Sequence, residues 1–547
     1  MSDICLVTLN STYQHTAFGL RYLYANLKEL QPKAKILEFT IHRPAQEIVD
    51  SLLALNPKII GFGIYIWNTN QSLKVVELLK QQRPDVCLVL GGPEVSYETE
   101  KQKITQLADY VICGEADFLF YEFCHQVLVL NERPKQRIIR GPLPEISQIQ
   151  SPYNHFTDQD IEKRIVYVEA SRGCPYKCEY CLSSLDKSVR NFPLEKFLSD
   201  LQILIDRGAR QFKFIDRTFN LSPSISGRIL GFFLEKIASG LDLHLHFEMV
   251  PDRLPDELKL LIKKFPLGSL QFEIGVQTWN PQVAALVSRR QDYQKVQENL
   301  KFLKQETGVH THVDLIAGLP GETLESFAKG FDSLSSLDPG EIQVGILKRL
   351  KGTPIIRHDQ EWQMRYSAEP PFQILETKTM TVMELEKMQK FSKFWDLIAN
   401  SGNFVLTFQK IREENSQSSL FEWFWNLTDF LQTRHPLGHS IHLLDLVRSL
   451  LIYFEEICKW QVKEILATDY QNGRPGPLPV FLRSETNKLL THPTENLAPA
   501  HLPKRQKLHF QFSRLKKELG EGRVQHEHER AQEKELKPLH EIEIERQ

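Results

Sequence analysis

The alternation of short apolar runs with amphipathic helical patterns is the feature that most constrains the fold of this chain. Uninterrupted apolar runs recur through the first part of the chain, separated by segments with apolar residues every three or four positions. Helices between such runs can cover both faces of a parallel sheet. We therefore expect one doubly wound domain, with a ligand site beyond the carboxyl ends of its strands. The expected strands are Ile4–Leu9, Lys35–Thr40, Ile59–Trp67, Val86–Gly92 and Tyr110–Gly114.

A second series of the same kind begins at Ile165. Six βα units in about 190 residues are too few for a closed eightfold barrel, but they suit a partial one. In such a fold, residues near the carboxyl ends of strands are candidates for catalysis or cofactor binding. The expected strands are Ile165–Ala170, Phe212–Asp216, His244–Val250, Leu270–Thr278, His310–Gly318 and Ile342–Leu350.

The remaining segments differ in composition. A stretch rich in Pro, Gln, Ser and Asn separates the two series and predicts a linker. From about Pro370 the patterns become helical, and the tryptophans there are expected to form a local core. Dense mixed charge from about Lys504 predicts a solvated helix or a disordered tail. The predicted divisions are 1–135, a linker at 136–163, a barrel-like core at 164–365, a helical domain at 366–503 and the tail at 504–547.

The predicted fold class is thus α/β. An N-terminal doubly wound (Rossmann- or flavodoxin-like) parallel sheet precedes a partial (β/α)6 barrel and an α-helical C-terminal region. The net charge of −2 gives no basic field for a nucleic acid or an anionic membrane. No apolar run approaches the roughly 18 residues of a membrane span, and the N-terminus lacks signal-peptide features. We expect a cytoplasmic protein, in which clustered cysteines are more often metal-binding or catalytic than disulfide-bonded.

Three of the chain's 8 cysteines lie close together in "SRGCPYKCEYC", at Cys174, Cys178 and Cys181, directly after the first strand of the second series. Three thiolates in one loop suit an iron–sulfur cluster or zinc. A structural zinc site wants a fourth ligand, usually from a second close pair, and the sequence has no second C-x-x-C. A cubane cluster held by three cysteines leaves one iron free to bind a substrate or cofactor.

This spacing, placed after the first strand of a partial barrel, resembles the radical S-adenosylmethionine superfamily. "FEIGVQTWNPQVAALVSRRQ", "VDLIAGLPGET" and "LKRLKGTPI" follow in the order of that family's fourth, fifth and sixth strands. The resemblance implies a 4Fe-4S cluster on the three cysteines, whose open iron binds S-adenosylmethionine. It also implies an electron donor such as flavodoxin or ferredoxin, and one-electron cleavage of the cofactor to a 5′-deoxyadenosyl radical.

The resemblance further implies individual cofactor contacts. Tyr180 would face the adenine, Gln277 and Thr278 the ribose or methionine end, and Arg290 the carboxylate, while Gly318 would allow close backbone approach. The chain departs from the family's Gly-Gly-Glu turn after the second strand. There Asp216 is the expected substitute, and Glu248, at the end of the third strand, is a further expected contact. Pairing of these acids with a neighbouring arginine such as Arg217 or Arg253 is the alternative.

The first domain resembles the cobalamin-binding domain of one subclass of that superfamily. "LGGPEVS" and "CGEADFLF" match its strand-end loops, which implies cobalamin contacts for Gly91, Gly92, Gly114 and Glu115. Gly-rich turns also occur in any doubly wound fold. The Asp-x-His-x-x-Gly motif that supplies a histidine to cobalt in some cobalamin proteins is absent, because His15 is four residues before Gly19. A hydrogen-bonding role in the loop is therefore expected for His15.

The leading functional hypothesis is a radical enzyme that uses cobalamin to transfer methyl groups to unactivated carbon, or that catalyses another radical rearrangement. The small-molecule substrate is not readable from the sequence. A second hypothesis is a tRNA or protein methylthiotransferase, which would need a second cluster on cysteines such as Cys5, Cys87, Cys113 and Cys124. The third is a non-catalytic sensor that binds a corrinoid or a cluster, with the C-terminal helices as a partner platform.

Overall fold

The computed structural model describes residues 2–436, 441–472, 474 and 477–483. The chain divides into two compact units. The first unit comprises residues up to Glu248 together with 286–289 and 347–375, and the second comprises 249–285, 290–346 and the residues from 376 onward. The charged tail predicted from Lys504 lies outside the described residues.

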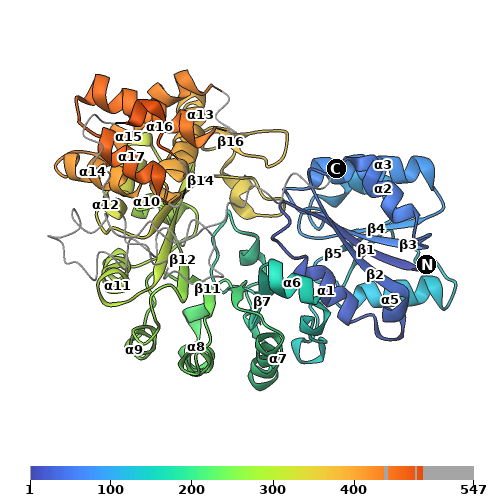
Figure 1. Cartoon of the computed structure of the whole chain (residues 1–547). Helices are drawn as coiled ribbons and strands as arrows, with labels where there is room; N and C mark the ends of the chain where they lie inside the picture. The colour runs from blue at the N-terminus through green and yellow to red at the C-terminus, as the bar shows by residue number, and fades with distance from the viewer. Residues whose placement is uncertain (1, 437–440, 473, 475–476, 484–547) are drawn as a thin grey trace. The chain divides into compact units, whose positions relative to one another are not determined.

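The first unit opens with a parallel six-stranded sheet of order β2-β1-β3-β4-β5-β6 (Figure 1). Five of its strands are those predicted from the apolar runs. The sixth, β6, lies in the segment predicted to be a linker and pairs with β5. The strands are β1 (Ile4–Asn10), β2 (Ala34–Thr40), β3 (Ile59–Gly63), β4 (Cys87–Gly91), β5 (Tyr110–Cys113) and β6 (Ile138–Arg140).

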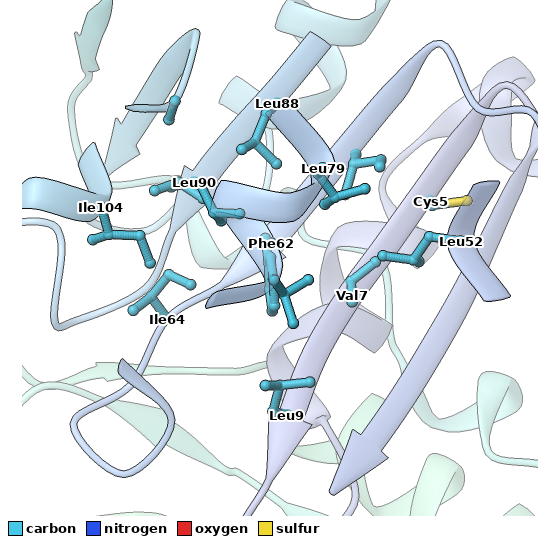
Figure 2. Packing of buried hydrophobic residues seen from close by; sticks show 14 of the residues in the cluster. Cys5, Val7, Leu9, Leu52, Phe62, Ile64, Leu79, Leu88, Leu90 and Ile104 are labelled. Atoms are coloured by element: carbon cyan, nitrogen blue, oxygen red, sulfur yellow. The ribbon is translucent and has the colours of Figure 1, made fainter. Parts of the chain in front are cut away.

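Two hydrophobic clusters form on the two faces of this sheet, because successive residues of each strand point to opposite faces. Cys5, Val7 and Leu9 of β1 pack into one cluster with the helices α2, α3 and α4, as Figure 2 shows in part. Ile4 and Leu6 pack into the other cluster with α1 and α5. The helices are α1 (Phe18–Ala25), α2 (Ala45–Leu53), α3 (Thr69–Gln82), α4 (Lys103–Leu107) and α5 (Leu119–Leu128).

The first unit continues with helix α6 (Asp158–Lys163), which also lies in the segment predicted to be a linker. Its N-terminus is fixed by a capping box between Thr157 and Asp160. Three parallel strands follow, with β10 paired on one side to β7 and on the other to β11. These elements are β7 (Val166–Val168), α7 (Leu194–Asp206), β10 (Gln211–Phe214), α8 (Pro223–Ala238) and β11 (His244–Met249).

The second unit contains three further parallel strands, with β13 between β12 and β14. Their order along the chain, with helices between them, completes the six βα repeats predicted from the sequence. The elements are α9 (Asp256–Ile262), β12 (Leu270–Gln277), α10 (Pro281–Leu286), α11 (Tyr293–Glu306), β13 (His310–Ala317), α12 (Leu324–Ser335) and β14 (Glu341–Ile346). A short pair, β15 (Arg365–Tyr366) and β16 (Ile374–Glu376), lies between β14 and the C-terminal helices in the chain.

The C-terminal region of the second unit is helical, as predicted. Trp395 is buried, stacks edge-on against Phe331 of α12, and donates from Nε1 to the Ile342 carbonyl at 2.9 Å. Trp423 and Trp460 stack in parallel at 5.6 Å, so these aromatic rings form a core of their own. The helices are α13 (Val382–Trp395), η8 (Asp396–Asn400), α14 (Val405–Glu414), α15 (Leu420–Arg434), α16 (Leu443–Ile452), η9 (Tyr453–Cys458) and α17 (Lys463–Gln471).

The predicted fold class is therefore confirmed: a doubly wound parallel sheet, a second parallel βα series and a helical C-terminal region. Among the described residues, no helix has the length and apolar character needed to cross a membrane.

Candidate functional site

The cysteine loop is enclosed by a small antiparallel hairpin of β8 (Ser171–Arg172) and β9 (Arg190–Asn191). Cys174 and Cys178 are buried, and Cys181 is partly exposed. The backbone N–H of Cys174 donates to the Asp186 carbonyl at 3.0 Å, which ties the start of the loop to its return. Burial raises the pKa of the Cys174 thiol, so a positive partner is needed to favour the thiolate.

Gly173 permits the sharp entry into this loop. Its φ of +94° lies in the left-handed region, and a Cβ at this position would lie 1.8 Å from the Ser188 carbonyl oxygen. No side chain fits so close to backbone, so the hairpin can close over the cysteines only with glycine here. Gly173 was not predicted from the sequence, although a glycine directly before the first cysteine could have indicated a sharp turn there.

Glu179, between the second and third cysteines, anchors the loop to segments far away in the chain. Glu179 is buried, with 3% of the residue exposed. Its carboxylate accepts hydrogen bonds from the Ser288 hydroxyl and from Arg357 at 2.5 Å, and it is hydrogen-bonded to His358 Nε2 at 2.9 Å. Its backbone N–H donates to the Val287 carbonyl at 3.1 Å, and its carbonyl accepts from Ile355 at 3.0 Å. These bonds fix the loop from two sides, and no local pattern signals them.

Arg289 supplies the positive partner for the cysteine loop. Its guanidinium donates to Cys178 Sγ at 3.4 Å and to the Tyr180 hydroxyl at 3.4 Å. A cation beside a sulfur favours the thiolate that metal binding requires. Burial raises the pKa of Tyr180, which keeps its phenol neutral. The sequence analysis selected the next residue, Arg290, which is exposed.

Two acidic residues predicted to contact the cofactor lie after β10 and in β11. Asp216 is buried and accepts from Ser171 Oγ at 2.6 Å and from the Ala170 N–H at 3.0 Å. Burial raises the pKa of Asp216 to about 7. Through its two hydrogen bonds, Asp216 holds the segment that leads into the cysteine hairpin. Glu248 pairs with Arg217 at 2.8 Å, the alternative that the sequence left open.

The other predicted cofactor contacts lie in the second unit. Gln277 ends β12 at a β-bulge, with a φ of +73° that is strained for a residue with a side chain. Thr278 is buried and donates to Glu322 at 2.6 Å. Gly318, directly after β13, has a φ of +86°. Strained or glycine-only backbone thus follows two neighbouring strands at their carboxyl ends.

The predicted cobalamin contacts follow β4 and β5 of the first sheet. Gly92 has a φ of +102°, and its Cβ would lie 2.5 Å from the Ile64 carbonyl oxygen, so packing alone explains this glycine. Gly91 has only ordinary van der Waals neighbours. Gly114 has a φ of +82°, and among the described residues no atom lies within 4 Å of its would-be Cβ. The backbone at Gly114 therefore leaves room for a ligand.

Glu115 links this sheet edge to the cysteine hairpin. It accepts from Arg172 Nη1 at 2.9 Å and from Arg190, which lie on the two strands of the hairpin. Arg172 also pairs with Asp117 at 2.9 Å and with Glu169 at 2.9 Å, and its side chain is 13% exposed. The loop after β5 and the cysteine loop are thus joined by a largely buried ion-pair network.

An aromatic pair that the sequence analysis did not select follows β3. Tyr65 and Trp67 stack at 4.5 Å with an interplanar angle of 10°, and Trp67 is 49% exposed. Trp67 Nε1 donates to the Leu9 carbonyl at 3.2 Å, which fixes the ring at the carboxyl edge of the sheet. A half-exposed flat surface at this edge suits a large planar ligand.

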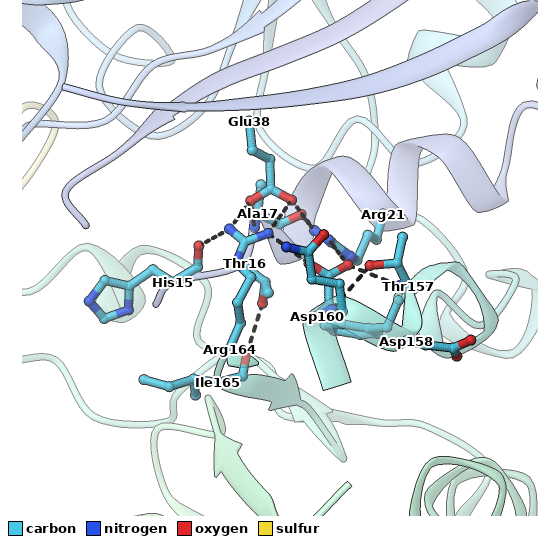
Figure 3. A network of polar contacts seen from close by, with 12 residues as sticks. His15, Thr16, Ala17, Arg21, Glu38, Thr157, Asp158, Asp160, Arg164 and Ile165 are labelled. Carbon is cyan, nitrogen blue, oxygen red and sulfur yellow. Dashed lines mark hydrogen bonds and ion pairs between the residues drawn. The ribbon is translucent and has the colours of Figure 1, made fainter. Parts of the chain in front are cut away.

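The loop after β1 is held by a polar network that Figure 3 shows. Arg21 and Arg164 each pair with both Glu38 and Asp160, at distances of 2.6–2.8 Å. Arg164 also donates to the His15 carbonyl, and His15 Nδ1 bonds the Tyr167 hydroxyl at 2.6 Å. Burial, with the nearby charges of Lys213 and Arg164, lowers the pKa of His15. His15 thus has the hydrogen-bonding role expected from the sequence, with the Tyr167 hydroxyl as its partner.

The cysteines proposed for a second cluster are core residues. Cys5 and Cys113 pack in the cluster on one face of the first sheet, whereas Cys87 and Cys124 pack in the cluster on the other. Burial raises the pKa values of Cys5 and Cys87 to about 11. Thiols separated by a sheet cannot share one cluster, so these four do not form the second site of a methylthiotransferase.

Comparison with known families matches three segments of the chain in order. Residues 4–123 match the B12 binding domain, and residues 168–334 match the radical SAM superfamily. Residues 360–532 match a domain described as a protein of unknown function (DUF4080).

An uncharacterized methyltransferase, PH0819, from Pyrococcus horikoshii is 23% identical over 361 residues, or 61% of this chain and 76% of the relative. The cobalamin-dependent radical SAM methyltransferase TokK from Streptomyces tokunonensis is 24% identical over 326 residues, which cover 53% of this chain and 46% of TokK. The structure of the cobalamin-dependent S-adenosylmethionine radical enzyme OxsB with aqua-cobalamin and S-adenosylmethionine shares the fold. It aligns with a TM-score of 0.56 and 12% identity over 86% of this chain and 78% of OxsB.

The residues present fit the cofactors of these domains. Three thiols lie in one glycine-closed loop with a guanidinium at Cys178, as a cluster requires. The open backbone at Gly114 and the exposed face of Trp67 lie at the sheet edge where a doubly wound domain binds its ligand. The cofactors are accordingly a [4Fe-4S] cluster, S-adenosylmethionine and cobalamin. The chain thus carries a B12-binding domain followed by a radical S-adenosylmethionine domain, and its relatives include a cobalamin-dependent radical SAM methyltransferase.

Proposed function

We propose that this enzyme transfers a methyl group to an unactivated carbon of a small molecule. The observation that carries the proposal is the ion-pair network in which Arg172 and Arg190 of the cysteine hairpin meet Glu115. It couples the segment proposed to hold the cluster to the loop proposed to hold cobalamin. Methyl transfer needs both cofactors to serve one substrate, whereas a rearrangement needs only the radical.

We propose Cys174, Cys178 and Cys181 as the cluster ligands, with Arg289 stabilising the Cys178 thiolate. When bound, the cluster and S-adenosylmethionine supply a 5′-deoxyadenosyl radical, and cobalamin supplies a methyl group. We propose that Tyr180 contacts the adenine and that the strained backbone at Gln277 and Gly318 faces S-adenosylmethionine. Thr278, Arg290, Asp216 and Glu248 are further proposed contacts, while Gly91, Gly92, Gly114 and Glu115 are proposed for cobalamin.

Hydrogen bonds and ion pairs within the protein change how three of these residues would act. Asp216 is already hydrogen-bonded to Ser171, and Glu248 is already paired with Arg217. Both are therefore proposed to affect the cofactor by positioning the protein groups around it. Arg289 has a direct sulfur contact, which favours it over Arg290 as the basic residue of the site. We propose residues 1–135, 164–365 and 366–503 as the functional domains, and a flavodoxin or ferredoxin as the electron donor.

Product analysis tests the proposed reaction. The full chain would be produced with cobalamin available, reconstituted with iron and sulfide without oxygen, and incubated with S-adenosylmethionine and a chemical reductant. Mass spectrometry would quantify 5′-deoxyadenosine and S-adenosylhomocysteine. We expect both products, since methyl loading consumes one S-adenosylmethionine and radical formation another. The Arg289→Met variant, which keeps bulk without charge, should lose both.

Deoxyadenosine without S-adenosylhomocysteine, in protein whose bound cobalamin is verified, would contradict methyl transfer and indicate a rearrangement. Bound cofactors with neither product, even with a cell extract of small molecules as substrate source, would indicate the sensor hypothesis. A methylthiolated product would revive the methylthiotransferase hypothesis, against the separation of Cys5 and Cys113 from Cys87 and Cys124.

A further inference from the structure

Two histidines and a glutamate meet at the amino ends of β13 and β14, in the second unit. His310 and His312 begin β13, and Glu341 begins β14. Residues two apart on a strand share one face, so both imidazoles lie on the same face of the sheet. The register pairs His312 directly with Glu341 across the two strands. The H-T-H pattern of β13 and the register with β14 thus bring three potential metal ligands to one point.

The geometry of the three side chains is compact. The Nε2 atoms of His310 and His312 each lie 3.1 Å from the same carboxylate oxygen of Glu341, Oε1. One ligand atom from each residue can be chosen so that all lie within 4.8 Å of one another. In a tetrahedral zinc site with ligand bonds of about 2.0–2.1 Å, ligand atoms are separated by about 3.3 Å. The observed separations are close to that spacing.

We propose that His310, His312 and Glu341 bind a divalent transition-metal ion, with Zn²⁺ as the expected ion. Two imidazoles and one carboxylate suit zinc and similar ions, whereas Mg²⁺ and Ca²⁺ prefer all-oxygen sites. Three protein ligands leave the fourth position for water. The side chain of Glu341 is 1% exposed, and those of His310 and His312 are 18% and 12% exposed, so the site is largely shielded.

Neighbouring residues provide the outer contacts that a metal-bound histidine needs. The Gln343 side-chain amide lies 2.8 Å from His312 Nδ1, the nitrogen that must carry a proton when Nε2 binds metal. With its amide oxygen turned to this nitrogen, Gln343 would accept a hydrogen bond from the Nδ1–H of His312. Gly340 makes room for the other imidazole, because a Cβ there would lie 2.9 Å from His310 Nδ1.

The proposed metal is separate from the radical chemistry. β13 runs from His310 to Ala317, and Gly318, a proposed S-adenosylmethionine contact, follows its opposite end. At about 3.3 Å per residue, the two ends of this strand are about 23 Å apart. The ion would therefore tie the start of β13 to the start of β14 as a structural element, independently of the cysteine cluster.

Elemental analysis of the full chain, freed of any histidine tag and grown with zinc, tests the proposal. We expect about one zinc per chain in the wild type, counted separately from cluster iron. Glu341→Gln keeps the size of the side chain and removes the charge, and it should lower zinc affinity at least tenfold in competition with a chelator. His42→Ala, which removes an exposed histidine, is the matched control and should keep the zinc.

X-ray absorption at the zinc edge identifies the site without relying on a variant that folds. Nitrogen and oxygen neighbours at about 2.0–2.1 Å with imidazole scattering would support the proposal, whereas sulfur at about 2.3 Å would place the zinc on cysteines and overturn it. Equal zinc affinity of the wild type and the Glu341→Gln variant in competition with the chelator would also overturn it. So would a wild type that binds no zinc and whose melting temperature is unchanged by added Zn²⁺.

Discussion

Two loops of the first unit follow the first strand of a parallel βα series, and they are fixed in different ways. The loop after β1 is held by charge: Arg21 and Arg164 pair with Glu38 and Asp160, with all four side chains at most 10% exposed. The loop after β7 is held by a glycine fit at Gly173 and by bonds to Glu179, and it carries three thiols.

The difference shows which of the two loops has atoms available to bind a cofactor. In the loop after β1, His15 is bonded through Nδ1 to Tyr167, and its carbonyl accepts from Asn10 at 2.8 Å. In the loop after β7, the main anchoring groups are Gly173, Glu179 and backbone amides, and of the sulfurs Cys178 Sγ accepts from Arg289. A loop that is held mainly by other groups can give its sulfurs to a cofactor.

The largest expected effect comes from the thiols themselves. Cys174→Ala, Cys178→Ala and Cys181→Ala should each abolish assembly of the cluster, because the proposed cluster is held by only three thiolates, one on each of three irons. Iron and sulfide content and the visible spectrum after anaerobic reconstitution measure this. Cys458→Ala, which removes a cysteine of the C-terminal helices, is the control. A full cluster in a chain that lacks all three thiols would refute the assignment.

Gly173→Ala should have the next largest effect. The new Cβ would meet the Ser188 carbonyl oxygen at 1.8 Å, in addition to the cost of about 1–2 kcal/mol for left-handed backbone. Gly208→Ala is matched in backbone, with a φ of +101°, but no described atom lies within 4 Å of its Cβ. We expect loss of bound iron in the first variant only. Equal iron content in both would show that the glycine fit does not close the hairpin.

Glu179→Gln tests the distant anchors of the cysteine loop. The variant leaves the buried His358 beside an uncharged amide and removes the ion pair with Arg357, whose side chain is 59% exposed, so we expect a cost of about 2 kcal/mol in the free energy of unfolding, mainly from the buried bond. Glu195→Gln removes an equally short ion pair, with Arg228 at 2.6 Å, but the side chains there are 57% and 75% exposed. That control should cost at most about 1 kcal/mol. Urea midpoints of the cofactor-free chain measure both, and similar shifts would contradict the prediction.

The sequence predicted the strands well and the long-range anchors poorly. Continuous apolar runs and the C-x-x-x-C pattern are local, so the strands and the cysteine loop could be placed from them. Two strands were predicted too long, because the apolar runs to Trp67 and Leu350 continue past the strand ends at Gly63 and Ile346. Strand β6 has only three residues, and it was missed because so short a run gives no periodicity. Glu179 bonds His358, which is 179 residues away, and Arg289 differs from Arg290 only in its three-dimensional partners. No spacing rule encodes such contacts.

Buried carboxylates in the two regions should respond oppositely to pH. Burial raises the pKa of Asp216 from 3.8 to about 7, although the hydrogen bonds from the Ser171 hydroxyl and the Ala170 amide act in the opposite direction. Between about pH 4 and 7 the folded state keeps a proton that the unfolded state loses. The contribution of Asp216 to the unfolding free energy should therefore fall with rising pH, by at most about 1.4 kcal/mol per unit.

The Asp216→Asn variant should flatten this slope in urea unfolding at pH 5, 6 and 7. Against the raising effect of burial, two guanidinium groups lower the pKa of Asp160 to about 2. The stability from Asp160 is fully present above about pH 4 and is lost only as the pH falls through about 2. Asp160→Asn should lower stability without changing the slope between pH 5 and 7. A slope unchanged by Asp216→Asn would contradict the contrast.

The smallest expected effect is on cobalamin binding by His15→Gln. The ligand motif is absent, the pKa of His15 is lowered by burial and nearby cations, and Nδ1 is bonded to Tyr167. We expect the dissociation constant to change by less than about fivefold, since one neutral hydrogen bond contributes about 1 kcal/mol or less. Tyr167→Phe, which removes the same bond but keeps the imidazole, should match it.

Electron paramagnetic resonance of bound cob(II)alamin should show no coupling to a histidine nitrogen. A wild-type nitrogen coupling that His15→Gln removes and Tyr167→Phe retains would show that His15 binds cobalt through its other nitrogen. The loop after β1 would then be a ligand loop held in place by its ion pairs.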